Sequence, residues 1–491
     1  MNSITTPDVN QLWDVIVIGT GMGGATLGHA LAKSGRSVLF LEAGQQTSGS
    51  GWVESATPGF GQLPPETRSK LLLRGGRVCE PVDDGEGDSG VVPFMGIGPG
   101  GSSALYGMAL ERFFPQDFQT WPLSYQEMEP WYEAAERLYR VRGTVDPIRQ
   151  ELAPHLLTPP SQSASNSAIF GELASRGLHP YRLHAGCERV DGCKLCQGYL
   201  CDRACKNDSR RICLDPALQF ENTALLTETP AQSLEVQGRT VTHVVTPRAK
   251  LAGRVIVLAA GALVTPGLMP EQTNRSGCVG RYLMRHAIDL YCLTKAPSYE
   301  SASDTKDLGL NDFYHVDQDL LGNVQAFGPA LPANYLLNMP GRSRLSRLAN
   351  PLISRIADRR ARSPVVAAML QDDPLKDNYV SGRKIHHRFG ADDLRRQQRF
   401  REIVMDNFQS LGATQLWKKS KNRAGLAHAC GTCRFGESPE TSVLDRWNRA
   451  HEMDNLYVAD ASFLPTSGGL GPALTIAANA LRVAEEVNRI L

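Results

Sequence analysis

Short apolar runs, glycine-rich turns and helical patterns follow one another near the start of the chain. The run WDVIVIG at residues 13–19 is apolar and rich in β-branched residues, which is typical of a strand buried on both faces. Residues 25–35 have helical spacing and end at a glycine, and residues 36–44 form a second apolar run. The pattern predicts a strand–turn–helix–strand unit with a right-handed crossover.

The same kinds of pattern predict further elements along the chain. We expect helices at 121–141 and 472–491, strands at 254–262 and 455–462, a hairpin at 233–247, and a second glycine cluster running into a helix at 96–110. Glycine, proline and polar residues dominate 45–100, which predicts long loop, and residues 152–168 have the composition of a linker. Residues 290–420 contain short strand-like and helical segments, and no glycine or proline signal marks clear boundaries between them.

Composition removes several classes of protein. Of 491 residues, 42% are apolar and 21% are charged, which argues against a disordered chain, a coiled coil or a fibre. The formal net charge of +1 gives no general attraction to nucleic acid or an anionic membrane. No apolar run reaches the ~20 residues that span a bilayer. The first ten residues lack the features of a secretory signal, so we expect a cytoplasmic location.

A dinucleotide-binding motif lies inside the first predicted unit. Gly19, Gly21 and Gly24 form the pattern GxGxxG between a strand and a helix, where glycine permits a tight turn and close approach of a pyrophosphate. Glu42 follows at the end of the second strand, where a carboxylate suits the ribose hydroxyls of an adenosine. The motif alone leaves NAD and FAD open.

Several other segments resemble landmarks of the glucose–methanol–choline (GMC) oxidoreductase family. They are GPGGSSALYG at 98–107, RVIVLAAGALVTPGLM at 254–269, CVGRYLMRHA at 278–287, HACGTCR at 428–434 and the C-terminal segment 455–485. The resemblance implies an α/β fold in which a Rossmann-like FAD-binding domain carries an inserted α+β substrate domain. We expect the FAD-binding domain at 1–119, 187–289 and 426–491, and the substrate domain at 120–186 and 290–425.

The resemblance also implies which residues bind FAD. They are Gly19, Gly21, Met22, Gly23, Gly24, Glu42, Gly100, Gly101, Ser102, Ser103, Ala231, Ala260, Gly261, Asp460, Ala461, Pro472, Ala473 and Leu474. Some family members attach FAD covalently through a histidine in or near the second glycine motif. The present sequence reads Ala104-Leu105-Tyr106 there, so we expect non-covalent FAD.

His428 matches the family's catalytic histidine, which takes a proton from a substrate hydroxyl while hydride leaves the carbon. A base with a pKa near neutrality suits this task. The family's second active-site position is usually His or Asn, but Gly471 occupies it here. Three explanations are open: the substrate domain supplies the polar group, the substrate is bulky, or His428 suffices alone. The candidates for the first are Tyr314, His315, His386 and His387.

Six of the 11 cysteines crowd into one stretch, at Cys187, Cys193, Cys196, Cys201, Cys205 and Cys213. The spacing of Cys196, Cys201 and Cys205 resembles that in catalytic subunits of bacterial FAD-dependent glucose dehydrogenases, which implies an iron–sulfur cluster. Cys193 is the candidate for a fourth ligand, and Cys187 and Cys213 are further candidates. A zinc ion or plain reduced thiols are the alternatives.

Together these features predict an FAD-dependent oxidoreductase that acts on an alcohol or similar C–H donor with His428 as base, and they favour a dehydrogenase. An electron-acceptor protein is a candidate partner, whereas nucleic acid and an integral membrane segment are not expected. The arginine-rich segment 341–363 fits a membrane- or partner-docking helix or a solvated one. Two alternatives are a flavin enzyme without net oxidation, such as a lyase, isomerase or decarboxylase, and a flavin-binding electron-transfer subunit.

Overall fold

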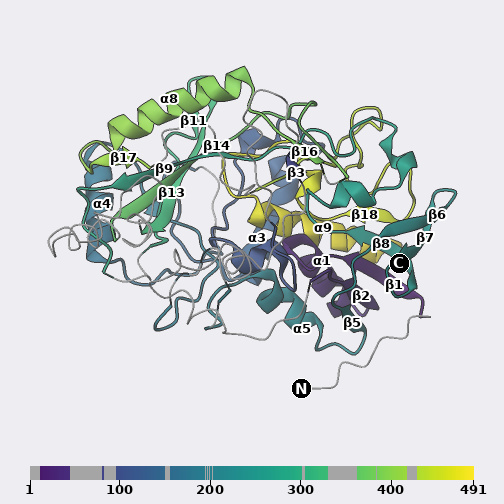
Figure 1. Cartoon of the computed structure of the whole chain (residues 1–491). Coiled ribbons are helices and arrows are strands. Elements are labelled where there is room, and N and C mark those ends of the chain that lie inside the picture. Colours follow the sequence, from purple (N-terminus) through teal and green to yellow (C-terminus); the bar gives the residue numbers. More distant parts are fainter. Residues whose placement is uncertain are drawn as a thin grey trace, which may run out of the picture.

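The structure is a computed structural model of the whole chain. It describes residues 11–44, 80–81, 95–149, 155–193, 195, 197, 200–201, 203–300, 305–329, 362–382, 384–416 and 428–491. Within these residues the chain forms two large sheets and the helices that pack on them (Figure 1).

The first sheet contains seven of the described strands in the order β5-β2-β1-β8-β7-β6, with β18 also paired to β8. The strands are β1 (Trp13–Ile18), β2 (Val38–Leu41), β5 (Thr223–Leu226), β6 (Ser233–Gln237), β7 (Thr240–Val245), β8 (Lys250–Leu258) and β18 (Leu456–Val458). Strands β5, β2, β1, β8 and β18 run parallel. All the strands that the sequence predicts in this region are present, including the hairpin of β6 and β7.

Long helices cover this sheet. Helices α1 (Met22–Lys33) and α9 (Ala473–Ile490) pack against each other, and α3 (Tyr125–Leu138) packs on α9. A Cβ added to Gly28 of α1 would lie 2.3 Å from the Phe40 ring, so this glycine allows the helix to approach β2 closely. The apolar residues of β1 and β2 are buried on both faces, as their unbroken apolar runs predict.

The second sheet has the order β17-β9-β14-β13-β10-β4 and is antiparallel. Its strands are β4 (Tyr181–Arg182), β9 (Ala287–Leu293), β10 (Leu308–Leu310), β13 (Gly322–Pro329), β14 (Pro364–Leu370) and β17 (Ala413–Gln415). Helix α8 (Ala391–Asn407) covers one face, at the top of Figure 1. Phe400 and Val404 of α8 join Val324 and Val366 of the sheet in a separate apolar core.

The remaining described elements are one further helix and several short pieces. They are α4 (Ala164–Ser175), α5 (Asp215–Ala217), the pair β11 (His315–Val316) and β12 (Asp319–Leu320), and the sheet of β3 (Glu80–Pro81), β15 (Tyr379–Ser381) and β16 (Lys384–His386). 3₁₀ turns lie at Gly101–Leu105, Pro115–Phe118, Thr265–Leu268, Glu271–Asn274 and Ala461–Phe463, and a π turn lies at Arg210–Leu214.

Two expectations about local structure are wrong. The predicted helix at 96–110 is only a 3₁₀ turn of five residues, because glycines with positive φ occupy its start. The predicted linker at 152–168 runs into α4, whose N-cap Ser163 accepts a hydrogen bond from the Asn166 amide. Serine and alanine there serve a helix start as well as a linker.

The two sheets agree in outline with a dinucleotide-binding part and an inserted part, but the predicted boundaries themselves stay a prediction. One segment departs from them. Helix α3 lies in the range 120–186 expected for the substrate domain, yet it packs on α9 in the core of the first sheet. Strand β4, from the same range, joins the second sheet.

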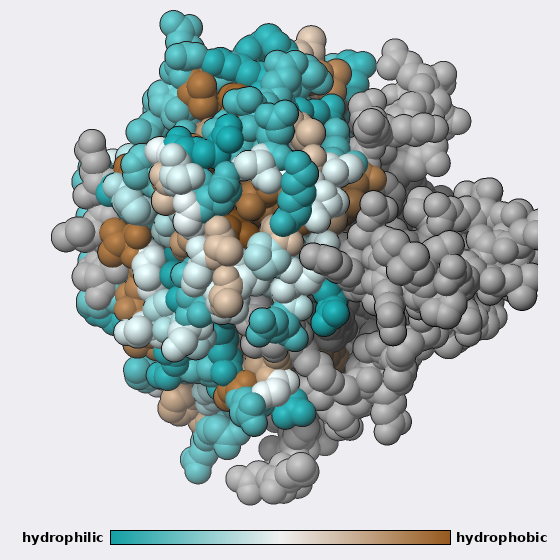
Figure 2. All heavy atoms as spheres, turned by 90° about the vertical axis from the view of Figure 1, so that its left-hand side faces the viewer, coloured by the Kyte–Doolittle hydropathy of each residue, from teal (hydrophilic) through white to brown (hydrophobic). Residues whose placement is uncertain are grey.

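On the coloured part of the face shown in Figure 2, apolar side chains lie scattered among hydrophilic ones. Among the described residues, no helix has the length and apolar character needed to cross a bilayer. Cys196, residues 341–361 of the arginine-rich segment and most of the predicted loop at 45–100 lie outside the described residues.

Candidate active site and cofactor-binding loops

The first glycine loop joins β1 to α1 and leaves one glycine facing open space. Gly19 has a φ of +103°, and a Cβ there would lie 2.3 Å from the Ala259 carbonyl oxygen. Gly23 and Gly24 are equally crowded, because a Cβ on either would lie 1.7 or 2.1 Å, respectively, from a backbone oxygen. Around a Cβ on Gly21, by contrast, no described atom would lie within 4 Å. The loop is therefore packed tightly everywhere except where a pyrophosphate would approach.

Helix α1 begins with free capacity for an anion. Its N-cap Gly21 makes no side-chain capping bond, and its first turn, which includes Met22, contains no acidic residue. Unpaired amides and the positive end of the helix dipole favour a phosphate at such a position.

The second glycine segment lies against the first. A Cβ on Gly101 would sit 3.1 Å from the Cα of Gly21, and the Gly100 amide donates to Thr20 Oγ1 at 3.3 Å. Ser103 is buried and donates to the Gly100 carbonyl at 2.7 Å, whereas Ser102 is exposed and accepts from an amide of the same segment. The structure thus brings both predicted glycine motifs together.

Ser209 links the two loops, and the sequence motifs do not identify it. Its hydroxyl lies 2.8 Å from that of Ser103 and 3.1 Å from the Thr20 carbonyl oxygen. Its amide donates to Ser103 Oγ at 3.0 Å. Ser209 lies between Cys205 and Cys213 and belongs to no glycine motif, so no local signal could have found it.

Glu42 is buried at the end of β2, and both of its carboxylate oxygens have protein partners. Oε1 accepts from the amides of Gly44 and Gly98 at 3.0 Å each. Oε2 accepts from the Thr20 hydroxyl at 2.5 Å. Glu42 therefore fastens the second glycine segment to the first sheet, and its contact with a ribose stays a prediction.

Asp460 plays a similar part at the end of β18. Its Oδ2 accepts from the Gly261 amide at 2.7 Å and from the Thr265 hydroxyl at 2.5 Å. Its Oδ1 accepts from the amide of Ser462, two residues further along the chain, at 2.8 Å, and Ala461 lies between them in the sequence. Burial raises the pKa of Asp460. Ala260, half-buried in the core of the first sheet, precedes Gly261 in the loop after β8.

The other predicted cofactor residues lie at the start of α9 and after β5. Pro472 is the N-cap of α9, Ala473 and Leu474 open the helix, and its first turn contains neither a side-chain cap nor an acidic residue. Ala231 lies half-buried between β5 and β6.

His428 contacts a second histidine that the sequence analysis did not single out. Its Nδ1 lies 2.8 Å from Nδ1 of His286, and the two rings cross at 81°. His286 Nε2 lies 2.7 Å from the Gly468 carbonyl oxygen. His428 itself has a φ of +68°, which is rare for a residue with a Cβ. His428 therefore has an uncommon backbone conformation, which fixes where its imidazole begins.

The opposite edge of the His428 ring faces Gly471. A Cβ on Gly471 would lie 3.8 Å from both Cε1 and Nε2 of His428, and no other described atom comes within 4 Å of it. Burial, with a further contribution from His286, lowers the pKa of His428 to about 3. The imidazole is therefore neutral at ordinary pH and has an edge with open space beside it.

A buried polar group extends behind this pair. Asp372 Oδ2 accepts from the Arg285 amide at 2.8 Å and lies 3.1 Å from His387 Nε2. Arg285 Nε donates to His387 Nδ1 at 3.3 Å. Burial raises the pKa of Asp372 to about 6 and lowers those of His286 and His387.

The expected sources of the missing polar group lie elsewhere. His315 is exposed, and His386 stacks on Tyr379. The Tyr314 hydroxyl donates to Asp117 at 2.6 Å and accepts from the Gly469 amide at 2.8 Å, which holds the loop before Gly471. The imidazole that contacts His428 lies on the edge opposite Gly471 and comes from His286, one residue before β9, within the segment CVGRYLMRHA.

The cysteine-rich stretch forms a compact thiol cluster. The sulfurs of Cys187, Cys193 and Cys205 all lie within 4.8 Å of one another, and all three residues are buried. Cys193 Sγ is 3.7 Å from Cys187 Sγ and 3.2 Å from Cys205 Sγ, while Cys201 Sγ is 3.4 Å from Cys205 Sγ. Three of the four predicted ligands thus meet together with Cys187, and Cys196 lies outside the described residues.

The thiol cluster adjoins the second glycine segment. Its residues pack with Tyr106, within that segment, and with Met108, directly after it. Cys213, a further candidate ligand from the sequence, lies 3.4 Å from the Tyr139 hydroxyl instead and contacts Thr26 of α1.

Known proteins with similar sequences are named as oxidases and dehydrogenases. The chain is 27% identical to paromamine 6'-oxidase of Streptomyces fradiae, over 98% of this chain and 92% of that one. It is 24% identical to 2-methyl-1,2-propanediol dehydrogenase of Mycolicibacterium austroafricanum, over 97% and 95%. It is 23% identical to the fructose dehydrogenase large subunit of Gluconobacter japonicus, over 96% and 97%.

The fold resembles that of pyridoxine 4-oxidase from Mesorbium loti, with a TM-score of 0.64, 18% identity and coverage of 97% of this chain and 99% of that one. A family model of GMC oxidoreductases matches residues 359–480. A model of FAD-dependent oxidoreductases matches residues 14–302, more than half of the chain. The protein therefore belongs to the FAD-dependent oxidoreductases and ends in a segment of the GMC type.

Proposed function

We propose that this enzyme oxidises an alcohol and that His428 accepts the proton of the donor's hydroxyl group. The observation that carries this proposal is the open edge of the His428 ring, which faces a glycine at Gly471. Two relatives support the substrate class, since they are named for a diol and a sugar. A neutral imidazole beside free space can accept a hydrogen bond from a hydroxyl and then its proton.

The loops fit the FAD that the family uses. The space beside Gly21 and the start of α1 would hold the pyrophosphate, and the start of α9 would lie at the flavin. Bound FAD would supply the acceptor for the hydride, and thus for both electrons, that leaves the alcohol carbon. The residues of the chain orient the donor and hold the proton.

We infer that FAD is held without a covalent bond. The segment Ala104-Leu105-Tyr106 offers neither histidine nor cysteine, and the Tyr106 hydroxyl donates to the Asn207 carbonyl at 2.7 Å. Release of all flavin by acid precipitation is the expected result, and flavin that stays with the denatured protein would contradict it.

A dehydrogenase with a cysteine-bound iron–sulfur cluster is the finer form of the proposal. Its support is the meeting of Cys187, Cys193, Cys201 and Cys205 beside the second glycine segment, together with the similarity to a fructose dehydrogenase subunit. Such a centre would pass electrons to an acceptor protein. A cytoplasmic location stays a prediction.

Zinc is the competing occupant of the thiol cluster. Four sulfurs at about 2.3 Å from one tetrahedral ion lie about 3.8 Å apart, close to the 3.2–3.7 Å between neighbouring thiols here. An iron–sulfur cluster would need the cysteine sulfurs to move further apart. Iron and acid-labile sulfide in anaerobically purified protein support the cluster, whereas zinc alone removes it.

The alternative without net oxidation rests on the missing polar side chain at Gly471. His286 contacts the opposite edge of the His428 ring and does not fill that position, so this ground stands. The experiment that tests alcohol oxidation mixes the oxidised holoenzyme with alcohols, sugars and sterols under argon and follows flavin absorbance. Bleaching by a hydroxyl compound is expected, and product formation without bleaching would favour the alternative. Slow reoxidation of the bleached enzyme by air identifies a dehydrogenase.

A further inference from the structure

Three groups form a directed line behind the open edge of His428. The Gly468 carbonyl oxygen lies 2.7 Å from His286 Nε2, and His286 Nδ1 lies 2.8 Å from His428 Nδ1. A carbonyl oxygen can only accept a hydrogen bond, so His286 Nε2 must carry a hydrogen. Neutral His286 then has a bare Nδ1, which can only accept.

The arrangement of His286 determines that of His428. Because His286 Nδ1 accepts, His428 must donate from its own Nδ1, and its neutral form leaves Nε2 with a lone pair. That nitrogen is the one beside Gly471. An isolated imidazole would distribute its hydrogen between the two nitrogens, but this line of contacts selects one arrangement.

We propose that His286 is a positioning residue that holds His428 in the tautomer with a hydrogen on Nδ1, so that Nε2 is the base. The inference rests on the proposed role of His428 in alcohol oxidation. When Nε2 takes up a proton, the Nδ1 hydrogen bond to His286 remains in place, so the ring does not need to turn during the reaction.

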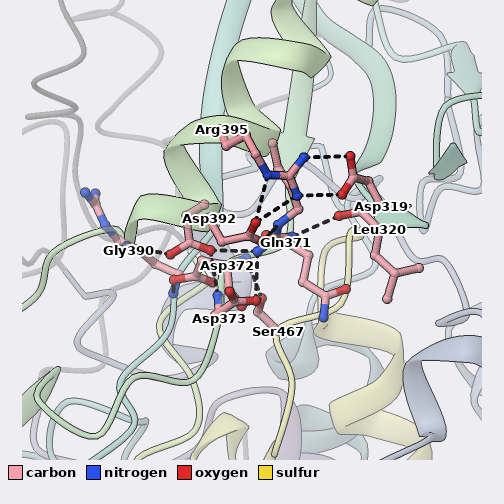
Figure 3. Close-up of polar contacts among 12 residues, drawn as sticks. Asp319, Leu320, Gln371, Asp372, Asp373, Gly390, Asp392, Arg395 and Ser467 are labelled. Atoms are coloured by element: carbon pink, nitrogen blue, oxygen red, sulfur yellow. Dashed lines mark hydrogen bonds and ion pairs between the residues drawn. The ribbon is translucent and has the colours of Figure 1, made fainter. Parts of the chain in front are cut away.

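The surroundings hold the start of this line in place. The Asp372 amide and the Ser467 hydroxyl lie 3.3 Å apart, and Ser467 precedes Gly468. Figure 3 shows Gln371, Asp372 and Asp373 between α8 and Ser467. Arg396 of α8 donates to the Gln371 carbonyl at 2.9 Å and to the Asp373 carboxylate at 2.7 Å. The helix, the end of β14 and the loop of Gly468 are thereby fastened together.

Charged groups from the neighbouring elements gather on the His286 side of the pair. Burial lowers the pKa of His286 and outweighs the opposing effect of Asp372, so the ring is neutral and its Nδ1 accepts. Arg285 and His387 both contact Asp372. Among the described histidines, His286 is the one whose ring contacts that of His428. The hydrogen on His428 Nδ1 is thus set by this neighbour.

The ¹⁵N chemical shifts of the histidine ring nitrogens report directly which nitrogen carries the hydrogen. In holoenzyme labelled with ¹⁵N-histidine, the His428 signals are assigned by their loss in His428→Gln. We expect a hydrogen-bearing Nδ1 and a bare Nε2 for His428, and the reverse pattern for His286. A hydrogen on His428 Nε2 in the neutral holoenzyme would overturn the proposal without any measurement of activity.

Two substitutions separate the acceptor of His286 from its donor. Asparagine places an oxygen near the position of Nδ1, so His286→Asn keeps an acceptor for His428. Glutamine reaches the position of Nε2, so His286→Gln keeps the donor to Gly468 and loses that acceptor. We expect His286→Gln to slow anaerobic flavin reduction by about 100-fold and to mix the His428 tautomers, while His286→Asn restores most of the rate and one tautomer.

His184 provides a matched control. It is buried, its Nε2 lies 2.8 Å from the Thr144 carbonyl oxygen, and its ring packs on Tyr181 rather than on His428. His184→Gln should leave the His428 tautomer unchanged. If His286→Gln reduces flavin at the wild-type rate while His428→Gln is inactive, the role of His286 is refuted and the proposed function stands. Full activity in His428→Gln would instead refute the proposed function.

Discussion

Gly471 lies directly beside the Nε2 edge of His428, where a Cβ would be 3.8 Å from Nε2. At that distance a small side chain would make ordinary contact without a clash. The glycine therefore leaves a space that the family pattern fills with His or Asn, and His286 provides an imidazole on the other edge of the ring.

Filling that space should change which donors the enzyme accepts. We expect Gly471→Asn to fold normally and to lower kcat/KM for large alcohols about 10-fold or more, because each lost apolar contact costs about 1–3 kcal/mol. Small alcohols should lose much less. Steady-state kinetics on a size series checks this, with Gly471→Ala as the smaller step. The same loss for all donors would contradict the assignment of this space to substrate.

Ser209 should matter for cofactor binding although it belongs to no recognised motif. Ser209→Ala removes the hydroxyl that donates to the Thr20 carbonyl and contacts the Ser103 hydroxyl. We expect FAD affinity to fall by the equivalent of about 1–3 kcal/mol. Titration of the apoprotein with FAD measures it, and exposed Ser34→Ala is the control. Unchanged affinity in Ser209→Ala would show that the two loops do not depend on this residue.

The thiol cluster makes a different ligand set testable. Cys187→Ser should abolish bound metal, because Cys187 lies with Cys193 and Cys205. Cys213→Ser should retain it, because that thiol contacts Tyr139 instead. Metal analysis of both anaerobically purified variants decides the matter. Normal metal content in Cys187→Ser would favour the ligand set expected from the sequence, in which Cys196 takes the place of Cys187.

Glu111 should make stability depend on pH. It is buried beside the Tyr181 hydroxyl, and burial raises its pKa from 4.5 to about 7. The folded state therefore binds more protons than the unfolded state between these values, so the contribution of Glu111 to stability is present below pH 4.5 and lost as the pH rises through 7.

The substitution Glu111→Gln removes this titration and keeps an oxygen for Tyr181. Between about pH 5 and pH 8 we expect the variant to gain roughly 3 kcal/mol relative to wild type at most. Chemical denaturation at both pH values measures the difference. Glu127→Gln is the control, because the pKa of exposed Glu127 is lowered and its effect is confined to more acidic pH. A difference that does not change with pH would place Glu111 in contact with water.

Local patterns predicted the elements whose apolar residues form an unbroken run or an unbroken helical stripe. Strand β1 is apolar except for Asp14, and the amphipathic helix α9 follows a helical periodicity, so both appear where expected. Helix α8 gave no clear signal because Arg396 and Gln397 are buried within it. Arg396 donates to the Leu320 carbonyl of β12, and Gln397 donates to Asp289 of β9. Buried polar residues interrupt the apolar stripe on which such predictions depend.

Sequence motifs identified His428 and the glycine loops but not the side chains that hold them. His286 is 142 residues from His428 in the chain, and Ser209 is 106 residues from Ser103. No spacing rule links such pairs, because only the folded chain brings them together. Gly471 showed that a polar group was missing on one edge of His428, and the imidazole on the opposite edge comes from outside the residues named as candidates.

The direct test of the central claim is single-turnover flavin reduction under argon by an alcohol that bleaches the wild-type enzyme. Wild type and His428→Gln are compared at saturating donor, with FAD content matched. If His428 takes the hydroxyl proton, the variant should bind FAD normally and reduce it at least about 100-fold more slowly. Reduction of the flavin at the wild-type rate in His428→Gln would contradict the account.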